Sequence, residues 1–253
     1  IIYNSTKGNF LHFVQIVTGI NADAEYLKPY FANTSSWYRP FDYGLINDDR
    51  TLIRFNAVVL FFSFGYYHVH TVFINFLSFI GLVALYKTFA SLLPDRKTEV
   101  FFSVFLIPTV LFWGSGVMKE GLILFALGLF IYSFFRIIRI LNSEARPHHK
   151  FIIKDLILPA FSIFLLTIIK VYVLICLLPA IISLVIIKFS GQRKMALKFV
   201  LTHIILILFA LNIHYLFPDY NVLETIQQKQ RDFYNVAELW NAGSAIDIGH
   251  LEP

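Results

Sequence analysis

The stretch IPTVLFWGSGVMKEGLILFALGLFIYSFFRIIRI, residues 107–140, contains two apolar runs joined by a GSG turn and the charged pair Lys119 and Glu120. A soluble domain rarely holds so much apolar sequence, and a simple membrane anchor has no need of two charges within it. Ionisable groups near membrane depth cost free energy, so they mark functional sites by default. The stretch therefore predicts a helical membrane protein with candidate functional residues at positions 119 and 120.

The composition of the whole chain agrees with membrane helices. Apolar residues make up 57% and charged residues 15% of the 253 residues, and the mean hydropathy is +0.67. The net charge is +5, and many of the basic residues flank the apolar runs, near residues 91–98, 141–150 and 189–198. This placement is the topology signal of the positive-inside rule, so we predict no nucleic-acid partner. The single cysteine, Cys176, excludes a disulfide framework and a cysteine metal site.

Six segments are apolar enough to be predicted as membrane spans: 69–90, 100–117, 120–140, 151–169, 171–189 and 196–217. The segment 52–66 is too short for the roughly 20 residues that a span needs, and predicts a helix in the interface or re-entering the membrane. If the basic loops are cytoplasmic, the six spans alternate, and residues 1–50, 115–120, 170–172 and the tail share the extracytoplasmic side.

We therefore divide the chain into three parts. Residues 1–67 are predicted to form an extracytoplasmic loop with an interfacial or re-entrant helix, residues 68–217 a bundle of about six spans, and residues 218–253 the start of an extracytoplasmic segment. The chain begins at Ile1 without a methionine and stops within a polar stretch. We therefore expect it to be a fragment of a longer protein.

Two acidic positions are candidates for chemistry on the outer side. Glu120 follows the GSG turn, where its carboxylate can hold a divalent cation or orient a sugar hydroxyl, while Lys119 can bind a phosphate. The alternative is a charged pair that caps the next helix. Asp23 is a candidate base for a hydroxyl, with Glu25 beside it as a weaker one. Acidic residues in a loop are otherwise simply solvated.

Basic and aromatic residues at the junctions of apolar runs are candidates for phosphate binding. Lys170 and Tyr172 can hold a lipid-linked phosphate, or they are a snorkelling lysine and an aromatic-belt tyrosine. Arg54, His68 and His70 surround the junction after the short segment and can contact a phosphate or a hydroxyl. On a helix the two histidines diverge by about 200°, which favours interfacial histidines over a shared metal.

The layout resembles the GT-C superfamily of polytopic glycosyltransferases. The likeness lies in five features in chain order: the acidic outer loop at Asp23, Phe64-Gly65, the P-x-x-L-F-W run at 108–113, Glu120, and the IIKVYVLICLLPA pair at 168–180. Such enzymes take a sugar from a polyprenyl-phosphate donor on the outer face of the membrane. The resemblance implies that Asp23 activates the acceptor, that Glu120 lies near the acceptor or a metal such as Mg²⁺ or Mn²⁺, and that Lys119 or Lys170 contacts the donor phosphate.

The sequence as a whole predicts an all-α polytopic membrane protein with a GT-C-like bundle. Its expected function is that of a hexosyl- or pentosyltransferase whose partners are membrane lipids, a lipid-linked sugar donor and a glycan, lipid or protein acceptor. A polysaccharide polymerase or ligase, a flippase or transporter for a lipid-linked anion, and a structural membrane subunit are the alternatives. The Phe/Ile/Lys/Asn-rich composition points to a bacterial inner membrane, with the site on its extracytoplasmic face.

Overall fold

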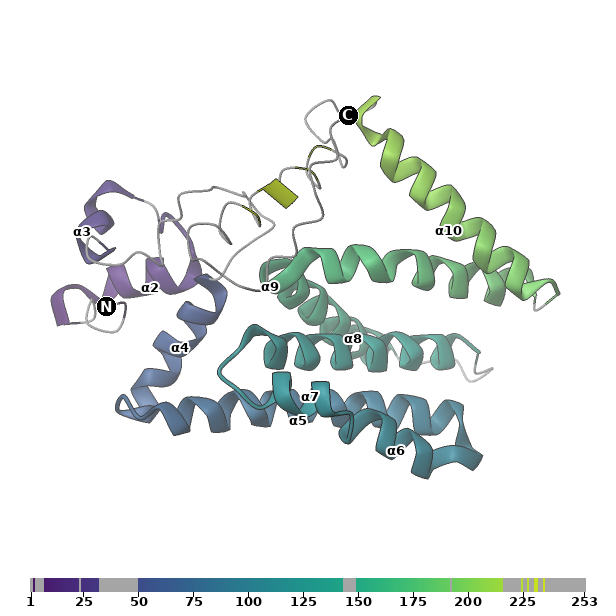
Figure 1. Ribbon diagram of the computed structural model, residues 1–253, viewed down its shortest axis with the longest axis horizontal. Coiled ribbons are helices and arrows are strands. Elements are labelled where there is room, and N and C mark those ends of the chain that lie inside the picture. The colour runs from purple at the N-terminus through teal and green to yellow at the C-terminus, as the bar shows by residue number, and fades with distance from the viewer. Residues whose placement is uncertain are drawn as a thin grey trace. The chain divides into compact units, whose positions relative to one another are not determined.

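The computed structural model describes residues 2, 7–22, 24–31, 50–142, 149–191 and 193–215, and positions 224, 227, 230, 231 and 234. All regular secondary structure in these residues is helical (Figure 1). The chain divides into two compact units, Ile1–Leu174 and Ile175–Pro253.

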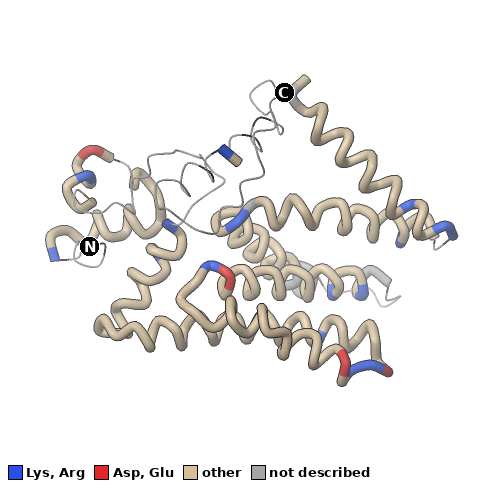
Figure 2. The backbone as a smooth tube through the Cα atoms, in the orientation of Figure 1, with Lys and Arg blue, Asp and Glu red and all other residues tan. Residues whose placement is uncertain are grey.

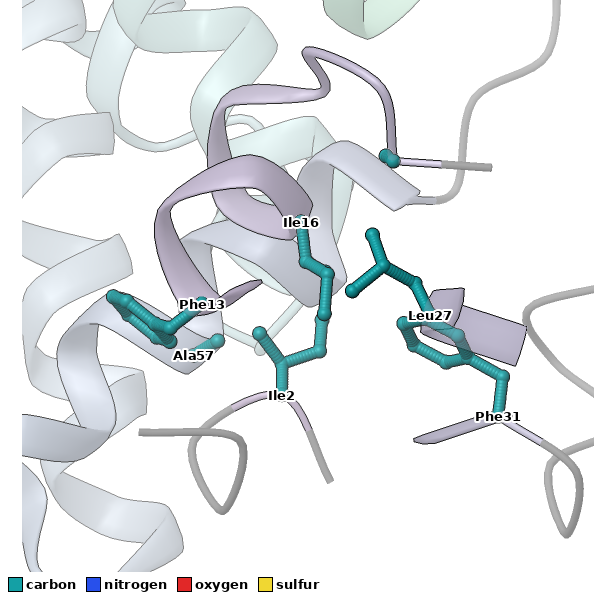
Figure 3. Packing of buried hydrophobic residues seen from close by; sticks show 7 residues of the cluster. Ile2, Phe13, Ile16, Leu27, Phe31 and Ala57 are labelled. Atoms are coloured by element: carbon teal, nitrogen blue, oxygen red, sulfur yellow. The ribbon is translucent and has the colours of Figure 1, made fainter. Parts of the chain in front are cut away.

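The first unit begins with a small apolar core, which no long apolar run in the sequence predicts. Helices α2 (Phe10–Thr18), η1 (Glu25–Leu27) and α3 (Lys28–Phe31) contribute to it together with α4 (Arg50–Ser63). Phe13 and Ile16 of α2, Leu27 and Phe31 beyond it, and Ala57 of α4 are all buried in this cluster (Figure 3). The short helices are therefore held by packing against α4, since helices of this length are not stable alone.

Helix α4 has 14 residues, fewer than a membrane span needs. It ends in a tight turn in which Phe64 and Gly65 both have positive φ, 50° and 91°. The chain then enters α5 (Tyr67–Leu92), which has 26 residues and is long and apolar enough to cross a membrane.

Helices α5 and α8 (Lys119–Asn142) pack side by side through glycines (Figure 1). A Cβ added at Gly128 would collide with the backbone of Gly81, and a Cβ at Gly121 would collide with Ile74. At both contacts the α8 residue lies the same number of positions further along the chain, so the two helices run parallel in constant register. At their C-terminal ends the Arg139 Nη2 donates a hydrogen bond to the Ser91 Oγ at 2.9 Å.

Because α5 and α8 are parallel, the chain must return between them. It does so through η3 (Pro94–Arg96), α6 (Lys97–Phe105) and α7 (Pro108–Gly114). The axes of the η3–α6 segment and α7 differ by 49° at the break before Pro108, whose ring removes a backbone donor. Together these bent helices are long and apolar enough for one span.

Helix α9 (His149–Ser190) is interrupted at Lys170, whose φ and ψ are −157° and 87°. Its second part, Tyr172–Ser190, qualifies as a span, whereas the first apolar part, Leu156–Lys170, is shorter. In the second unit, α9 ends, and α10 (Met195–Asn212) and η4 (Ile213–Tyr215) follow. Lys198 of α10 donates hydrogen bonds to the carbonyls of Ser190 and Gly191 at 3.0 and 2.8 Å, which satisfies the end of α9.

The described residues thus contain four helices that can cross a membrane, or five if the bent pair is one span. The described residues are those of a helical membrane protein. In the described residues the six predicted segments all correspond to helices, and the one at 151–169 lies in the first part of α9, whose stretch Leu156–Lys170 is counted as a shorter apolar helix. The sequence pattern marked this break as a loop between spans, and the structure makes it a bend within a continuous helical region.

Candidate functional site

Two predicted site residues that lie 50 positions apart in the sequence are in contact. The Lys170 Nζ lies 3.1 Å from the Glu120 Oε1, and the two side chains are only 24% and 35% exposed. Glu120 is in the first turn of α8, where the helix dipole favours a carboxylate. The pair is therefore shielded from water more than a surface ion pair, and its attraction is screened less.

Two further contacts lie at the break in α9. The Thr51 hydroxyl, in the first turn of α4, donates a hydrogen bond to the Ile168 carbonyl at 2.8 Å. The Tyr172 ring centroid lies 5.7 Å from the Lys170 Nζ. The site thus combines a carboxylate, an ammonium and a phenol, and α4 contacts the chain two residues before the ammonium.

The electrostatics of Lys170 keep it charged. Lys170 lies between the shorter apolar helix and the candidate span that begins at Tyr172. Burial lowers the pKa of its ammonium, but hydrogen bonds with Tyr172 and Glu120 and the attraction of the carboxylate outweigh this, so the pKa is raised above its ordinary value of 10.5. The ammonium is therefore protonated at neutral pH.

The turn before Glu120 is fixed to α5 by a polar side chain. With its amide nitrogen facing them, Asn75 donates hydrogen bonds to the carbonyls of Gly114 and Ser115, at 3.1 and 3.0 Å. Lys119, the first residue of α8, is half-buried next to Glu120. Asn75 therefore holds the turn before Lys119 and Glu120 against α5, and the contact of Gly121 with Ile74 holds the residue after them.

The structure does not bring all of the predicted residues to this pair. Asp23 lies outside the described residues. Glu25 forms an exposed ion pair with Lys28 at 3.1 Å, three positions along the chain. The Arg54 Nε donates a hydrogen bond to the Ile16 carbonyl at 2.9 Å, near the end of α2. These contacts favour a structural role for Arg54, which joins α2 to α4, and a solvated role for Glu25.

The two histidines have different environments, as their spacing on a helix predicts. His68 is exposed, while His70 is buried with both ring nitrogens engaged. Its Nδ1 lies 2.8 Å from the Asn56 Oδ1 and its Nε2 lies 2.7 Å from the Ser63 Oγ. Because the Asn56 oxygen only accepts, the Nδ1 donates to it and the Nε2 accepts from Ser63. This arrangement favours a structural role for His70 at the junction of α4 and α5.

The described residues do not form a set of donors for a divalent cation. No three His, Cys, Asp or Glu side chains gather in this part of the chain. The Glu120 carboxylate also faces an ammonium, which opposes a second cation. The Mg²⁺ or Mn²⁺ that the resemblance implies stays a prediction, because Asp23, the other predicted carboxylate, lies outside the described residues.

Sequence reasoning missed the residues that position the site. Thr51 lies in the first turn of α4. The sequence around it does not indicate that its hydroxyl bonds a carbonyl more than a hundred positions away. Asn75 gave a usable signal, because an amide within an apolar span needs a polar partner. The same signal, a polar side chain in an apolar run, applies to Asn56 and Ser63.

Comparisons with protein-family models, with curated proteins and with solved structures give no match. The resemblance to GT-C glycosyltransferases therefore stays a prediction. Two observations bear on the function of the chain: its helical membrane architecture and the geometry of the Glu120–Lys170 pair.

Proposed function

We propose that the chain is a membrane glycosyltransferase that moves a sugar from a polyprenyl-phosphate donor to a glycan, lipid or protein acceptor. The observation that carries the proposal is the Glu120–Lys170 pair, which joins a carboxylate and an ammonium at one end of the packed helices α5 and α8. We place this end on the extracytoplasmic face of a bacterial inner membrane, because the basic turns follow the opposite ends of these helices.

The reaction needs the two charges in different roles. The acceptor hydroxyl attacks the anomeric carbon, its proton passes to a carboxylate, and the carbon–oxygen bond to the phosphate breaks with its electron pair leaving on the phosphate. Lys170, with the Tyr172 phenol, stabilises the phosphate as negative charge develops on it. Glu120 orients or deprotonates the acceptor, together with Asp23 if the resemblance to the GT-C superfamily holds.

The pairing of the two groups suggests an order of events. Before the donor binds, Lys170 and Glu120 neutralise each other. A donor phosphate that attracts the ammonium weakens its hold on the carboxylate, and the freed Glu120 is then a better acceptor of a proton. Donor binding would thus activate the site before the acceptor arrives.

The distribution of charge favours an enzyme over a transporter. Figure 2 shows the Lys, Arg, Asp and Glu residues of α5 and α8 toward the helix ends, and residues 71–86 and 121–135 contain none. A transporter of a lipid-linked anion would carry charged or discontinuous helices near mid-membrane. A site at a membrane face suits a lipid-linked donor, whose phosphate lies at that depth.

The test uses the full-length protein in lipid vesicles with a radiolabelled polyprenyl-phosphate sugar. Donor binding and transfer of label to added acceptor are measured separately for the wild type, Glu120→Gln and Lys170→Met. We expect Glu120→Gln to lower transfer at least about 100-fold with donor still bound, and Lys170→Met to weaken donor binding about 10-fold or more.

The matched controls are Glu99→Gln and Lys97→Met, which remove an exposed carboxylate and an exposed ammonium at the start of α6. Both should bind donor and transfer label as the wild type does. Transfer that is indifferent to Glu120→Gln and Lys170→Met in folded protein would remove this site from the mechanism. Donor that crosses the bilayer without loss of its sugar would instead identify a flippase.

A further inference from the structure

The turn between α4 and α5 presents an unusual amount of aromatic surface. We define the aromatic turn as Phe62, Phe64, Tyr66 and Tyr67, whose side chains are 61–87% exposed. It lies within residues 55–86, a stretch that contains no Asp, Glu, Lys or Arg. Such a surface is unfavourable in water, and it suits the boundary between acyl chains and headgroups, where tyrosine is enriched.

The register of α5 against α8 fixes the depth of this turn. Gly121 lies against Ile74 at one end, and Arg139 is bonded to Ser91 at the other. The helix between Gly121 and Arg139 is about 27 Å long, which is close to the roughly 30 Å thickness of the hydrocarbon core. The Glu120 level and the Arg139 level therefore mark the two edges of that core.

Helix α5 extends beyond the Glu120 level. Tyr67 precedes Ile74 by two turns of helix, which corresponds to about 10 Å along the axis. Headgroups add about 5 to 8 Å on each side of the hydrocarbon core. A modest tilt of α5 places the aromatic turn within that layer, on the outer side of the site and away from the middle of the membrane.

The aromatic turn is also continuous with the surface of α5 that meets lipid. The Phe62 ring lies 6.0 Å from the Phe73 ring of α5, centroid to centroid, and Val72 next to it is exposed. An apolar side chain that is exposed on a membrane-spanning helix contacts acyl chains. The apolar surface of α5 that contacts lipid therefore continues up to the edge of the aromatic turn.

Two backbone N–H groups of the turn are satisfied within the protein. The Tyr66 N–H donates to the Ser63 carbonyl at 2.9 Å, and the Gly65 N–H donates to the Ser63 hydroxyl at 3.3 Å. The same hydroxyl bonds the buried His70, which bonds Asn56. The turn thus keeps its shape in a layer where water is scarce, as non-helical backbone in a membrane must.

From these observations we infer that the aromatic turn inserts into the headgroup layer on the side of the membrane where Glu120 lies, and binds lipid there. The sequence left open whether segment 52–66 lies in the interface or re-enters the membrane. The register of α5 and α8 favours the interface. The inference does not depend on the proposed enzymatic function.

The experiment measures depth with one fluorophore at a time. In the full chain carrying Cys176→Ser, a cysteine replaces Phe64, and a bimane label is attached after reconstitution in phosphatidylcholine vesicles. Phe79→Cys, exposed on α5 inside the predicted core, and Glu99→Cys, exposed in the first turn of α6 at the far end of α5, are the controls. Quenching is compared for lipids with a nitroxide on the headgroup, lipids with a nitroxide in mid-chain, and aqueous iodide.

We expect the Phe64 label to be quenched at least 2-fold more by the headgroup nitroxide than by the mid-chain nitroxide, and the Phe79 label to show the reverse. The Glu99 label should respond mainly to iodide. A Phe64 label that behaves like the Phe79 label would show a re-entrant turn, and one that behaves like the Glu99 label would show a turn in water. Either result overturns the inference.

A label can draw a turn into lipid by its own hydrophobicity, so a second readout is needed. Phe64→Trp in a chain whose three tryptophans are changed to phenylalanine reports depth with a native-like side chain. Quenching by lipids brominated near the headgroup must exceed quenching by lipids brominated near the chain end. The opposite order would overturn the inference even if the bimane result agrees with it.

Discussion

Two carboxylate–lysine pairs in this protein have the same N–O distance, 3.1 Å, and differ in nearly everything else. Glu25 and Lys28 lie three positions apart with side chains 91% and 55% exposed. Glu120 and Lys170 come from different helices, with side chains 35% and 24% exposed. The first pair follows from local geometry, while the second exists only because α8 and the break in α9 meet.

The comparison teaches that distance alone does not measure the importance of an ion pair. An exposed pair three positions apart contributes a few tenths of a kcal/mol and is screened by salt. A partly buried pair between elements is screened less, and removal of one partner leaves a poorly solvated charge. Local contacts should therefore tolerate substitution, and tertiary contacts should not.

The largest effect is expected from Gly128→Val, which breaks the tertiary contact that positions Glu120. Because a side chain at Gly128 meets the backbone of Gly81, α8 must shift or separate from α5. We expect a loss of about 3 kcal/mol or more in stability, or failure to fold. Thermal unfolding in detergent checks this, with Gly191→Val as the control, since a Cβ at Gly191 meets nothing.

Gly191 has a φ of 81°, so its own substitution by valine costs about 1 to 2 kcal/mol through backbone strain. Gly128→Val must therefore be clearly more destabilising than Gly191→Val. Equal effects would mean that α5 and α8 do not pack in the register described above.

The two histidines of α5 sharpen the same contrast between exposed and buried polar groups. His70→Ala removes a buried ring that links Asn56 and Ser63, and both side chains lose a hydrogen-bond partner. We therefore expect the free energy of unfolding to fall by about 2 kcal/mol. His68→Ala, at an exposed position, should stay within about 0.5 kcal/mol of the wild type. Chemical denaturation in mixed micelles measures both, and similar losses for the two variants would contradict the buried network.

Double-mutant cycles compare the two ion pairs directly. We expect a coupling free energy of about 1 kcal/mol for Glu120→Gln with Lys170→Met, and about 0.3 kcal/mol for Glu25→Gln with Lys28→Met. Raising the salt from about 0.05 to 0.5 M should remove the smaller coupling and leave most of the larger one. A Glu120–Lys170 coupling that vanishes with salt would identify it as a surface pair.

The smallest expected change is in the pH dependence of the Glu120–Lys170 coupling between neutral and moderately alkaline pH. A raised pKa means that the folded protein holds the Lys170 proton more tightly than the unfolded chain does. The contribution is thus complete below the unfolded value near 10.5 and is lost only as the pH rises through the higher folded value. Cycles at pH 7 and about 9 should agree, and a coupling lost by about pH 9 would mean a lowered pKa.

Part of the site could be predicted from the sequence because charge in an apolar run is informative wherever it occurs. Glu120 and Lys170 were singled out on that ground, and the alternation of the spans predicted that both lie on the extracytoplasmic side. The direct ion pair between them was not predicted, since no local spacing relates position 120 to position 170. Glu25 and His70 carried equally reasonable hypotheses, and the structure places them in a surface pair and a buried network.

By itself the sequence determined that this protein is helical and membrane-embedded, because apolar run length and the backbone's need for internal hydrogen bonds leave few alternatives. It also determined where charge lies along each helix. The tertiary structure alone decided that Gly81 and Gly128 bring α5 and α8 into parallel contact, and that Lys170 meets Glu120. Both contacts depend on how the surfaces of distant segments fit together. A periodic pattern in one segment contains no information about the shape of another segment.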